Sequence, residues 1–521
     1  MQRDGALTSL WQYDMPEYKS QTTKIPDKLF DVIVVGGGIT GVTTALLLQK
    51  TGRNCLLLEA HTLGFGTTGG TTAHINTLLD TPYSEIEKKF GEKNAQLIAT
   101  ITRAAINQIK KNIEDYKIEC SFEELPAYLF SQDKDQTKQL DEIAEASKKV
   151  GLKLEYSNKI PIPIPFEKAI KVEAQAKFHP TEYLFAIAKA YEDAGGIIVQ
   201  NCRVNNVDET DVNVEEADVV HVETSVGKTK ARQLIYATHI PPGINVLHLR
   251  CAPYRSYAMA ITLKNKAQYP DALVYDLYEP YHYYRTQLVK GKKYLIAGGE
   301  DHKTAHEKNT DACFLHLESY IRKYFDVDEI AFKWSSQYFE PADGLPYIGH
   351  LPGNPGNIFV ATGYGGNGMV YSNVAALVLK DLLVDDSKNE YIDLFNPNRI
   401  KPVAGFTNFA KENLDVAKQL IGKLFSAKKL EVLAGIANGE GKVVKFEDHT
   451  IALYKDDTGN LHAVNPSCTH MKCTVSWNIA EKSWDCPCHG ARYDCNGKVL
   501  TGPADRDLEI IELESLIEEE K

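Results

Sequence analysis

The pattern of apolar and polar residues divides this chain of 521 residues into two parts. Up to about residue 384, continuous apolar runs of strand length alternate with longer segments of helical periodicity. From residue 430 onward, short segments such as 450–454 and 461–464 alternate apolar with polar residues, with turn residues between them. Such alternation is typical of antiparallel strands with one buried face. The pattern therefore predicts a large α/β part followed by a small all-β domain.

The first strongly apolar run, residues 30–35, leads directly into a glycine-rich turn and then into a predicted helix over residues 42–49. A second apolar run over residues 54–58 follows the helix. The order strand, turn, helix, strand predicts a β-α-β unit of a parallel sheet.

Three glycines of this unit, Gly36, Gly38 and Gly41, occupy the places of the G-x-G-x-x-G motif. In that motif the first glycine permits a tight turn, the second lets the backbone approach a pyrophosphate, and the third allows close packing of helix and strand. The helix N-terminus attracts the phosphates, and Glu59, at the end of the second strand, is placed to accept hydrogen bonds from ribose hydroxyls. The unit predicts a bound dinucleotide; a glycine turn without a ligand is the alternative.

The middle of the chain carries weaker signals. Strand-like segments at residues 254–263, 273–278 and 294–297 indicate an antiparallel sheet. Asp301 and His302 follow a glycine pair, and we expect them to lie in a turn rather than to take part in catalysis.

Potential metal ligands gather near the C-terminus, where Cys468 and His470 are followed by Cys473 and by Cys-Pro-Cys-His at residues 486–489. Two cysteines and two histidines are the ligands of a [2Fe-2S] centre in which histidines replace cysteines on one iron. Tetrahedral zinc also accepts such a set, but zinc motifs usually pair cysteine with cysteine and histidine with histidine, whereas each half here mixes them. We therefore expect a cluster that carries electrons. The residues alone leave open whether Cys486 or Cys488 is a ligand.

Composition narrows the function class. The net charge of −12 argues against nucleic acid or an anionic membrane surface as a partner. We see no apolar run long enough to span a bilayer and no secretory signal near the N-terminus. Five of the ten cysteines are scattered before residue 468, as is typical of reduced thiols in a cytoplasmic enzyme.

Over residues 429–521 the chain resembles the Rieske ferredoxin family, on the motifs Cys-x-His and Cys-x-x-His-Gly and on the Trp-Asp and Gly-Pro-Ala segments around the second motif. The resemblance implies two sulfur ligands on one iron and two nitrogen ligands on the other, supplied by Cys468 and Cys486 and by His470 and His489. It also implies a disulfide between Cys473 and Cys488 that braces the two cluster loops.

One position departs from the respiratory-chain members of that family. Ala491 stands where they carry a serine that donates a hydrogen bond to a cluster sulfur, whereas Tyr493 keeps the other such donor. Hydrogen bonds to cluster sulfurs raise the reduction potential, so we expect a midpoint potential below that of the quinol-oxidising type.

Over about residues 10–383 the chain resembles the superfamily of D-amino-acid oxidase and glycine oxidase, on the first glycine motif and on a second glycine loop after the strand at 357–363. The resemblance implies an FAD-binding, Rossmann-like α/β domain with an antiparallel substrate sheet, whose substrate-facing part covers about residues 84–330. The further FAD contacts that it implies lie in two loops: Gly66, Thr67 and Thr68, and Gly363, Gly365, Gly366, Asn367, Gly368 and Met369. The cluster in the same chain also favours FAD over NAD, because a flavin can transfer electrons singly as well as in pairs.

Candidate substrate residues lie near residue 283. An arginine in roughly the place of Arg285 binds the substrate carboxylate in several amino-acid-oxidising members, and His282 lies close to it in the sequence. The alternatives are a surface ion pair for Arg285 and a hydrogen-bonded structural role for His282. His74 lies on the loop towards the flavin, where some members attach FAD covalently; the local pattern differs from theirs, and we expect non-covalent binding.

Nearly end to end, the chain resembles bacterial flavoproteins with a C-terminal Rieske domain. We predict an FAD domain over residues 1–389, a linker with a helix (406–425) over 390–428, and a Rieske domain over 429–521. The expected activity is oxidation of an amine or amino acid, with electrons passing from FAD to the cluster and on to an external protein or quinone acceptor. The alternatives are a pure electron relay between carriers and an oxidase that uses oxygen.

Overall fold

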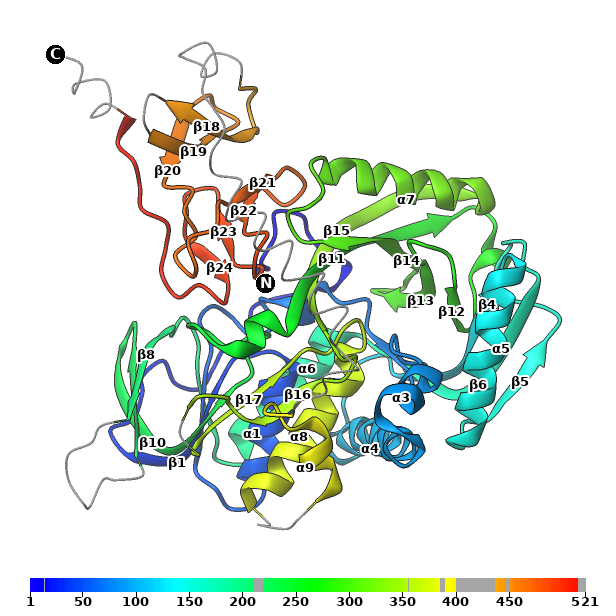
Figure 1. The fold of residues 1–521 in the computed structure, drawn as a ribbon, viewed down its shortest axis with the longest axis horizontal. Coiled ribbons are helices and arrows are strands. Elements are labelled where there is room, and N and C mark those ends of the chain that lie inside the picture. The colour runs from blue at the N-terminus through cyan, green and yellow to red at the C-terminus, as the bar shows by residue number, and fades with distance from the viewer. Residues whose placement is uncertain are drawn as a thin grey trace.

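The computed structural model describes residues 1–13, 15–209, 219–354, 356–384, 389–399, 436–446 and 449–513. Within these ranges the chain forms a parallel sheet with its helices, an antiparallel sheet, and a C-terminal all-β domain (Figure 1). The predicted connecting helix at 406–425 lies outside the described residues.

The first sheet has eight strands in the order β16-β17-β10-β1-β2-β7, with β9 and β8 continuing from β10. Its strands are β1 (Leu29–Val35), β2 (Cys55–Leu58), β7 (Ile197–Val199), β8 (Val204–Glu209), β9 (Val220–Thr224), β10 (Gly227–Tyr236), β16 (Tyr347–His350) and β17 (Ile358–Thr362). The pairs among β17, β10, β1, β2 and β7 are parallel. With α1 (Ile39–Gln49) between β1 and β2, the predicted β-α-β unit is confirmed.

Both faces of this sheet are buried, which explains why its strands are continuous apolar runs. In β1, Val32 and Val34 belong to the larger apolar core, whereas Ile33 and Val35 belong to a second cluster. On the side of the larger core, α1 packs against α6 (Pro180–Asp193) and α8 (Gly368–Val384).

The second sheet has nine strands in the order β15-β11-β14-β13-β12-β4-β6-β3, with β5 paired to β6. Its strands are β3 (His74–Ile75), β4 (Glu123–Ser131), β5 (Leu154–Ser157), β6 (Lys168–Lys177), β11 (Cys251–Leu263), β12 (Leu273–Asp276), β13 (Tyr283–Val289), β14 (Lys292–Lys303) and β15 (Val327–Pro341). Its neighbours are antiparallel except β12 and β4. The helices α5 (Lys134–Lys149) and α7 (Thr310–Tyr324) pack on this sheet. The helix α4 (Glu92–Tyr116) packs against α6 and α8 of the first half, and α3 (Tyr83–Phe90) lies against both α4 and α5. The predicted antiparallel sheet is confirmed.

The C-terminal domain is all-β, as predicted. It has a three-stranded sheet of β18 (Gly441–Phe446), β19 (His449–Lys455) and β20 (Leu461–Val464). A four-stranded sheet contains β21 (Ser476–Asn478), β22 (Ser483–Asp485), β23 (Arg492–Asp494) and β24 (Val499–Thr501). Drawn in orange and red in Figure 1, this domain lies beside the chain's N-terminus and the two larger sheets.

The N-terminal segment joins the C-terminal domain to the rest through buried ion pairs. Arg3 lies 3.0 Å from Glu481, and Asp4 lies 2.9 Å from Arg492. Glu481 also accepts a hydrogen bond from the backbone N–H of Ser335 on β15. Removing one member of a buried pair leaves an unpaired charge, so this network fixes the position of the C-terminal domain.

The segment after α8 also packs on the first domain. In α9 (Glu390–Phe395), Phe395 is fully buried, and the guanidinium of Arg399 lies 2.8 Å from the carboxylate of Asp343. Among the described residues, no helix is long and apolar enough to cross a membrane.

Candidate active site and metal centre

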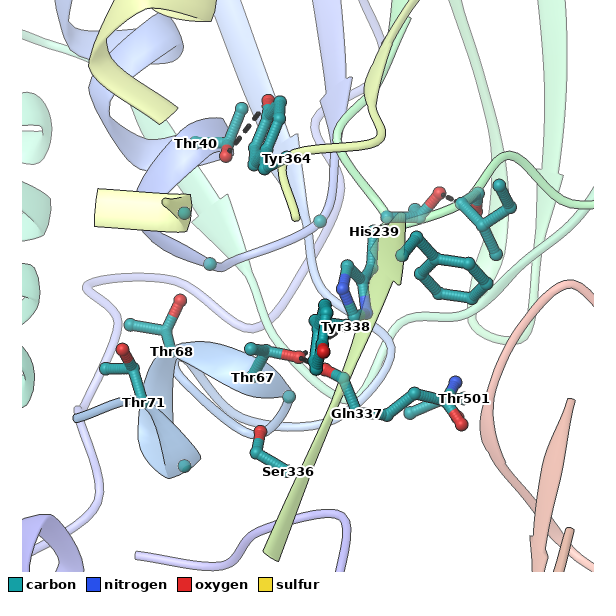
Figure 2. A pocket seen from close by; sticks show the side chains of 18 of the residues that line it. Thr40, Thr67, Thr68, Thr71, His239, Ser336, Gln337, Tyr338, Tyr364 and Thr501 are labelled. Carbon is teal, nitrogen blue, oxygen red and sulfur yellow. Dashed lines mark hydrogen bonds between the residues drawn. The ribbon is translucent and has the colours of Figure 1, made fainter. Parts of the chain in front are cut away.

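A cavity of about 330 Å³ lies where the carboxyl ends of the parallel strands meet the antiparallel sheet. Residues of both glycine loops and of strands β11, β14 and β15 line it. So do residues of the short helical turn at 66–72, which contains α2 (Thr67–Gly70). Figure 2 shows Thr40 and Tyr364 on one side and Thr67, Gln337 and Tyr338 on another. Crevices at the carboxyl ends of parallel strands are the usual ligand sites of α/β sheets.

The first glycine turn has no room for side chains. A Cβ atom on Gly36 would lie 2.4 Å from the carbonyl oxygen of Ala237, and its φ of +116° disfavours other residues. A Cβ atom on Gly41 would lie 1.9 Å from the carbonyl oxygen of Gly36. Gly38 is the N-cap of α1, so the unpaired N–H groups of the helix start lie beside the cavity. This geometry fits a bound pyrophosphate.

Glu59 lies at the end of β2 on the cavity wall. Its carboxylate accepts hydrogen bonds from the backbone N–H groups of Gly37 (2.6 Å) and His61 (2.8 Å). Burial raises the pKa of this carboxyl above its usual value, and the two N–H donors partly offset the effect. The acidic group is therefore beside the glycine turn, where a ribose would follow the pyrophosphate.

The other two predicted loops reach the same cavity. The hydroxyl of Thr68 accepts a hydrogen bond from the N–H of Ile39, which ties the turn at 66–72 to the start of α1. In the second loop, the side-chain oxygen of Asn367 accepts a hydrogen bond from the backbone N–H of Asp80. The backbone N–H of Gly366 donates to the carboxylate of Asp80. The predicted FAD contacts that line the cavity are Gly36, Gly38, Glu59, Gly66, Thr67, Thr68, Gly365, Gly366, Asn367, Gly368 and Met369. The two remaining predicted contacts, Gly41 and Gly363, do not line the cavity.

Arg285 differs from both expectations, because it neither lines the cavity nor reaches the surface. Its guanidinium is fully buried and donates to the carbonyl oxygens of Thr72, Ala73 and Phe178. These contacts place the loop at 72–73 against the guanidinium and engage both terminal nitrogens, while Nε is buried without a partner among the described residues. Because the side chain does not line the cavity, a substrate carboxylate there gains no partner from it.

His282 does not line the cavity either. Its Nδ1 atom lies 2.9 Å from a carboxylate oxygen of Asp276, and its ring stacks on Tyr320 with centroids 4.0 Å apart. This is the hydrogen-bonded structural role that was the alternative for His282. His74, by contrast, does line the cavity, with its Nδ1 atom 2.7 Å from the hydroxyl of Tyr275.

The expected turn at Asp301 and His302 is wrong, because β14 continues through both residues, with His302 paired to Arg255 of β11. Asp301 lines the cavity and accepts a hydrogen bond from the hydroxyl of Tyr338. Asp80 also presents its carboxylate to the cavity. Sequence reasoning assigned Asp301 to a turn and did not single out Asp80, because neither acid stands in a recognisable motif.

The potential cluster ligands converge in the C-terminal domain. The thiols of Cys468 and Cys486 are close enough to hydrogen-bond, which lowers the pKa of Cys468 to about 6. The rings of His470 and His489 lie with centroids 5.0 Å apart. Nδ1 of His470 and both ring nitrogens of His489 are buried without a partner among the described residues. Two thiols beside unpartnered imidazole nitrogens fit a cluster with mixed ligands.

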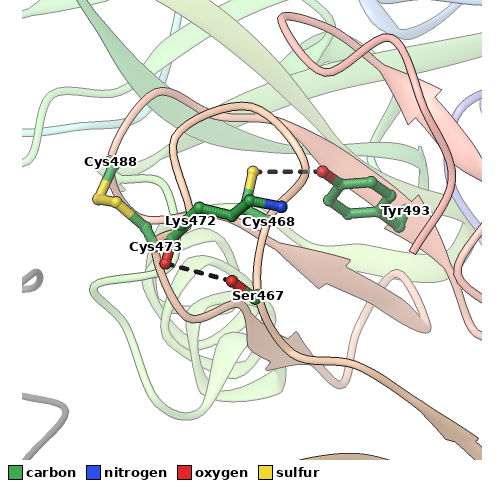
Figure 3. The surroundings of a disulfide bond; sticks show 6 residues. All are labelled: Ser467, Cys468, Lys472, Cys473, Cys488 and Tyr493. Carbon is green, nitrogen blue, oxygen red and sulfur yellow. Dashed lines mark hydrogen bonds between the residues drawn. A yellow bond between two sulfur atoms is a disulfide. The ribbon is translucent and has the colours of Figure 1, made fainter. Parts of the chain in front are cut away.

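A disulfide joins Cys473 to Cys488 (Figure 3). The sulfur atoms of these two residues and of Cys486 lie within 4.8 Å of one another. Because the disulfide uses two of the three sulfurs, Cys486 keeps a free thiol, which favours it over Cys488 as the predicted ligand. The hydroxyl of Tyr493 lies 3.2 Å from the sulfur of Cys468, placed to donate to it.

The two sites are adjacent. Residues 499–502, 504 and 505 of the C-terminal domain line the cavity of the first domain. Nε2 of His470 donates a hydrogen bond to the carbonyl oxygen of Gly243 in the first domain. Arg203 of the first domain donates to the carbonyl oxygen of Val499.

Comparison with known proteins agrees with this geometry. The family model described as FAD dependent oxidoreductase, DAO, matches residues 31–382, and the model of the Rieske [2Fe-2S] domain matches residues 428–512. YhfW of Bacillus subtilis (strain 168), named as a Rieske 2Fe-2S iron-sulfur protein, is 35% identical over 488 residues, which cover 93% of this chain and 94% of that protein.

Two further relatives match the first domain. Gamma-glutamylputrescine oxidoreductase of Escherichia coli (strain K12) is 24% identical over 374 residues, covering 69% of this chain and 84% of that protein. The crystal structure of glycine oxidase from Geobacillus kaustophilus superposes with a TM-score of 0.58 at 16% identity, covering 71% of this chain and 99% of that one. The latter likeness concerns the fold alone.

Proposed function

Because this chain belongs to the DAO family of FAD-dependent oxidoreductases and carries a Rieske [2Fe-2S] domain, we propose that it oxidises a carbon–nitrogen bond and passes the electrons through the cluster to an external acceptor. When bound, FAD supplies hydride acceptance and single-electron release, and the cluster supplies one-electron transfer. The residues of the chain hold, orient and enclose these groups.

The proposed electron transfer from FAD to the cluster rests on one observation. The C-terminal domain supplies part of the wall of the FAD cavity, and its ligand His470 is hydrogen-bonded to Gly243 of the FAD domain. The buried pairs Arg3–Glu481 and Asp4–Arg492 hold this arrangement. Electrons released in the cavity therefore have a short route to the cluster within one chain.

The nature of the substrate bond rests on the family and on the cavity. Gamma-glutamylputrescine, which appears in the name of one relative, is a compound with an amine nitrogen. In the cavity, the antiparallel sheet faces the two glycine loops, so a small molecule can lie between them. Holding the reacting bond in a fixed orientation can supply much of the rate enhancement without a dedicated base.

Anaerobic titration of the purified holoprotein with a panel of N-methyl amines and amino acids tests this proposal. A substrate should bleach the flavin absorbance, and the paramagnetic signal of the reduced cluster should follow without any added carrier. Bleaching only by a reduced carrier protein or by NAD(P)H would support the pure relay instead. Hydrogen peroxide formed in step with turnover in air would support the oxidase.

A pair of variants tests the electron path separately. Cys486→Ser should abolish the cluster signal and the reduction of an artificial one-electron acceptor, while substrate still bleaches the flavin. Cys495→Ser, in the same domain but outside the ligand set, should behave as the wild type. Unchanged acceptor reduction in Cys486→Ser would refute transfer through the cluster.

A further inference from the structure

The antiparallel sheet lines the cavity with acids and phenols. Asp301 of β14 accepts from the hydroxyl of Tyr338, and its second carboxylate oxygen has no hydrogen-bond partner in the described part of the chain. Asp80 holds the N–H of Gly366 and exposes the rest of its carboxylate to the cavity. Further phenols on this wall come from Tyr275, Tyr281 and Tyr283.

Positive charge is scarce on the same wall. Arg203 is the single arginine or lysine among the described residues that line the cavity, and its guanidinium donates to Val499 at the edge near the C-terminal domain. Burial, together with the charges of Arg285 and Lys177, holds the pKa of His74 well below its usual value, so this ring is neutral. Arg285 does not line the cavity, and its terminal nitrogens donate to buried carbonyl oxygens. A substrate carboxylate would thus meet acids rather than a guanidinium fork.

A second cavity, of about 400 Å³, adjoins the first and shares Tyr281, Asp301 and Tyr338 with it. Glu279 and Glu340 add carboxylates to its wall, and Arg250 and Lys303 add cations. One terminal nitrogen of Arg250 donates to the carbonyl oxygens of Pro397 and Arg399. Acids and phenols therefore line both cavities, which meet at the three shared residues, and the two cations lie only on the second.

From this arrangement we infer that the substrate binds as an organic cation, a protonated amine without a carboxylate next to its reacting carbon, held by Asp301 and Asp80 among the tyrosines. The reacting nitrogen passes its proton to one of these carboxylates before hydride leaves the neighbouring carbon. Carboxylates and aromatic faces are the groups that recognise ammonium ions. Asp301 and Asp80 are specificity-determining residues in this assignment. It rests on the proposed oxidation of a carbon–nitrogen bond and names the substrate class.

Binding of two matched probes to the holoprotein tests the inference without turnover. Benzyltrimethylammonium is a cation and benzoate an anion on the same ring, and a difference titration of the flavin spectrum measures the Kd of each. The cation should bind and benzoate should bind at least about tenfold more weakly, since the cavity carboxylates attract the ammonium charge and repel the carboxylate, and the aromatic faces favour the cation. Because neither probe delivers electrons, this result is independent of whether the cluster accepts electrons.

Variants then assign the residues. Asp301→Asn and Asp80→Asn should each raise the Kd of the cation roughly tenfold or more and leave that of benzoate unchanged or lower. Asp271→Asn, which changes an exposed carboxylate of the same domain, is the matched control and should have no effect. Tighter binding of benzoate than of the cation, binding of neither probe, or an unchanged cation Kd in both cavity variants would each overturn the inference.

Discussion

The Nε2 atom of His470 lies 3.0 Å from the carbonyl oxygen of Gly243, so a histidine of the Rieske domain that we propose as a cluster ligand is hydrogen-bonded to the FAD domain. His248 of the FAD domain adds a ring whose centroid lies 4.6 Å from that of His470 and 5.9 Å from that of His489. His489 is itself buried. The histidine side of the cluster site thus faces the FAD domain.

This docking depends on buried charges, and one substitution tests it. Glu481→Gln should lower the free energy of unfolding by about 3 kcal/mol, because the buried Arg3 loses one of its two carboxylate partners and keeps only Asp4. It should also slow cluster reduction after flavin bleaching. Chemical denaturation and stopped-flow spectroscopy measure the two effects.

The control for that substitution is Glu142→Gln, which removes an exposed pair with Lys88 and should change stability by less than about 1 kcal/mol. Equal effects of the two substitutions would show that the buried network does not hold the domains together.

Tyr493 should tune the cluster. Tyr493→Phe removes the donor that lies 3.2 Å from the sulfur of Cys468, and a hydrogen bond of about 1 kcal/mol corresponds to roughly 40 mV for one electron. The midpoint potential should fall by about that amount in a redox titration followed by paramagnetic resonance. Ala491→Ser, which supplies a hydroxyl at a fully buried position, should raise it. Shifts of the same sign in both variants would contradict this account.

The pH dependence of cation binding should follow the cavity acids. Desolvation raises the pKa of Asp301 to about 7 and that of Asp80 to about 6. The charges of Asp80 and Glu279 raise the pKa of Asp301 further, and the hydroxyls of Ser256 and Tyr338 partly offset this rise. Both acids are neutral at low pH and gain their charge as the pH rises, so benzyltrimethylammonium should bind more tightly at pH 8 than at pH 5.5. Asp301→Asn should flatten the part of the profile near pH 7. A flat profile in the wild type would argue that neither carboxylate contacts the cation.

Retention of FAD should depend on the packing at Gly41. Gly41→Ala would bring a Cβ atom to 1.9 Å from the carbonyl oxygen of Gly36, so the first glycine turn must move. We expect this variant to be purified with less than about a tenth of the flavin, measured from absorbance after denaturation. Gly356→Ala, where a Cβ atom meets nothing within 4 Å, should retain the full amount.

The β-α-β unit and the cluster motif could be predicted because their signals are local. Gly36, Gly38 and Gly41 lie within one turn, and each half of the cluster motif is a short loop, so spacing alone restricts the chemistry. Periodicity likewise predicted the two kinds of sheet. The turn assigned to Asp301 was wrong because a glycine pair can also continue a strand when its partner strand is long, as β11 is.

The sequence by itself determined which cofactors this protein can hold, because the cluster ligands, the glycines and the strands beside them follow one another within short segments of the chain. Only the tertiary structure decided what faces the substrate. Arg285 is covered because the loop at 72–73 folds over it, and Asp301 lines the cavity at the point where the register between β14 and β11 shifts. It also decided that Arg3 and Asp4 hold the Rieske domain from the far end of the chain. Such contacts join residues hundreds of positions apart, and their free energy depends on burial that no local pattern specifies.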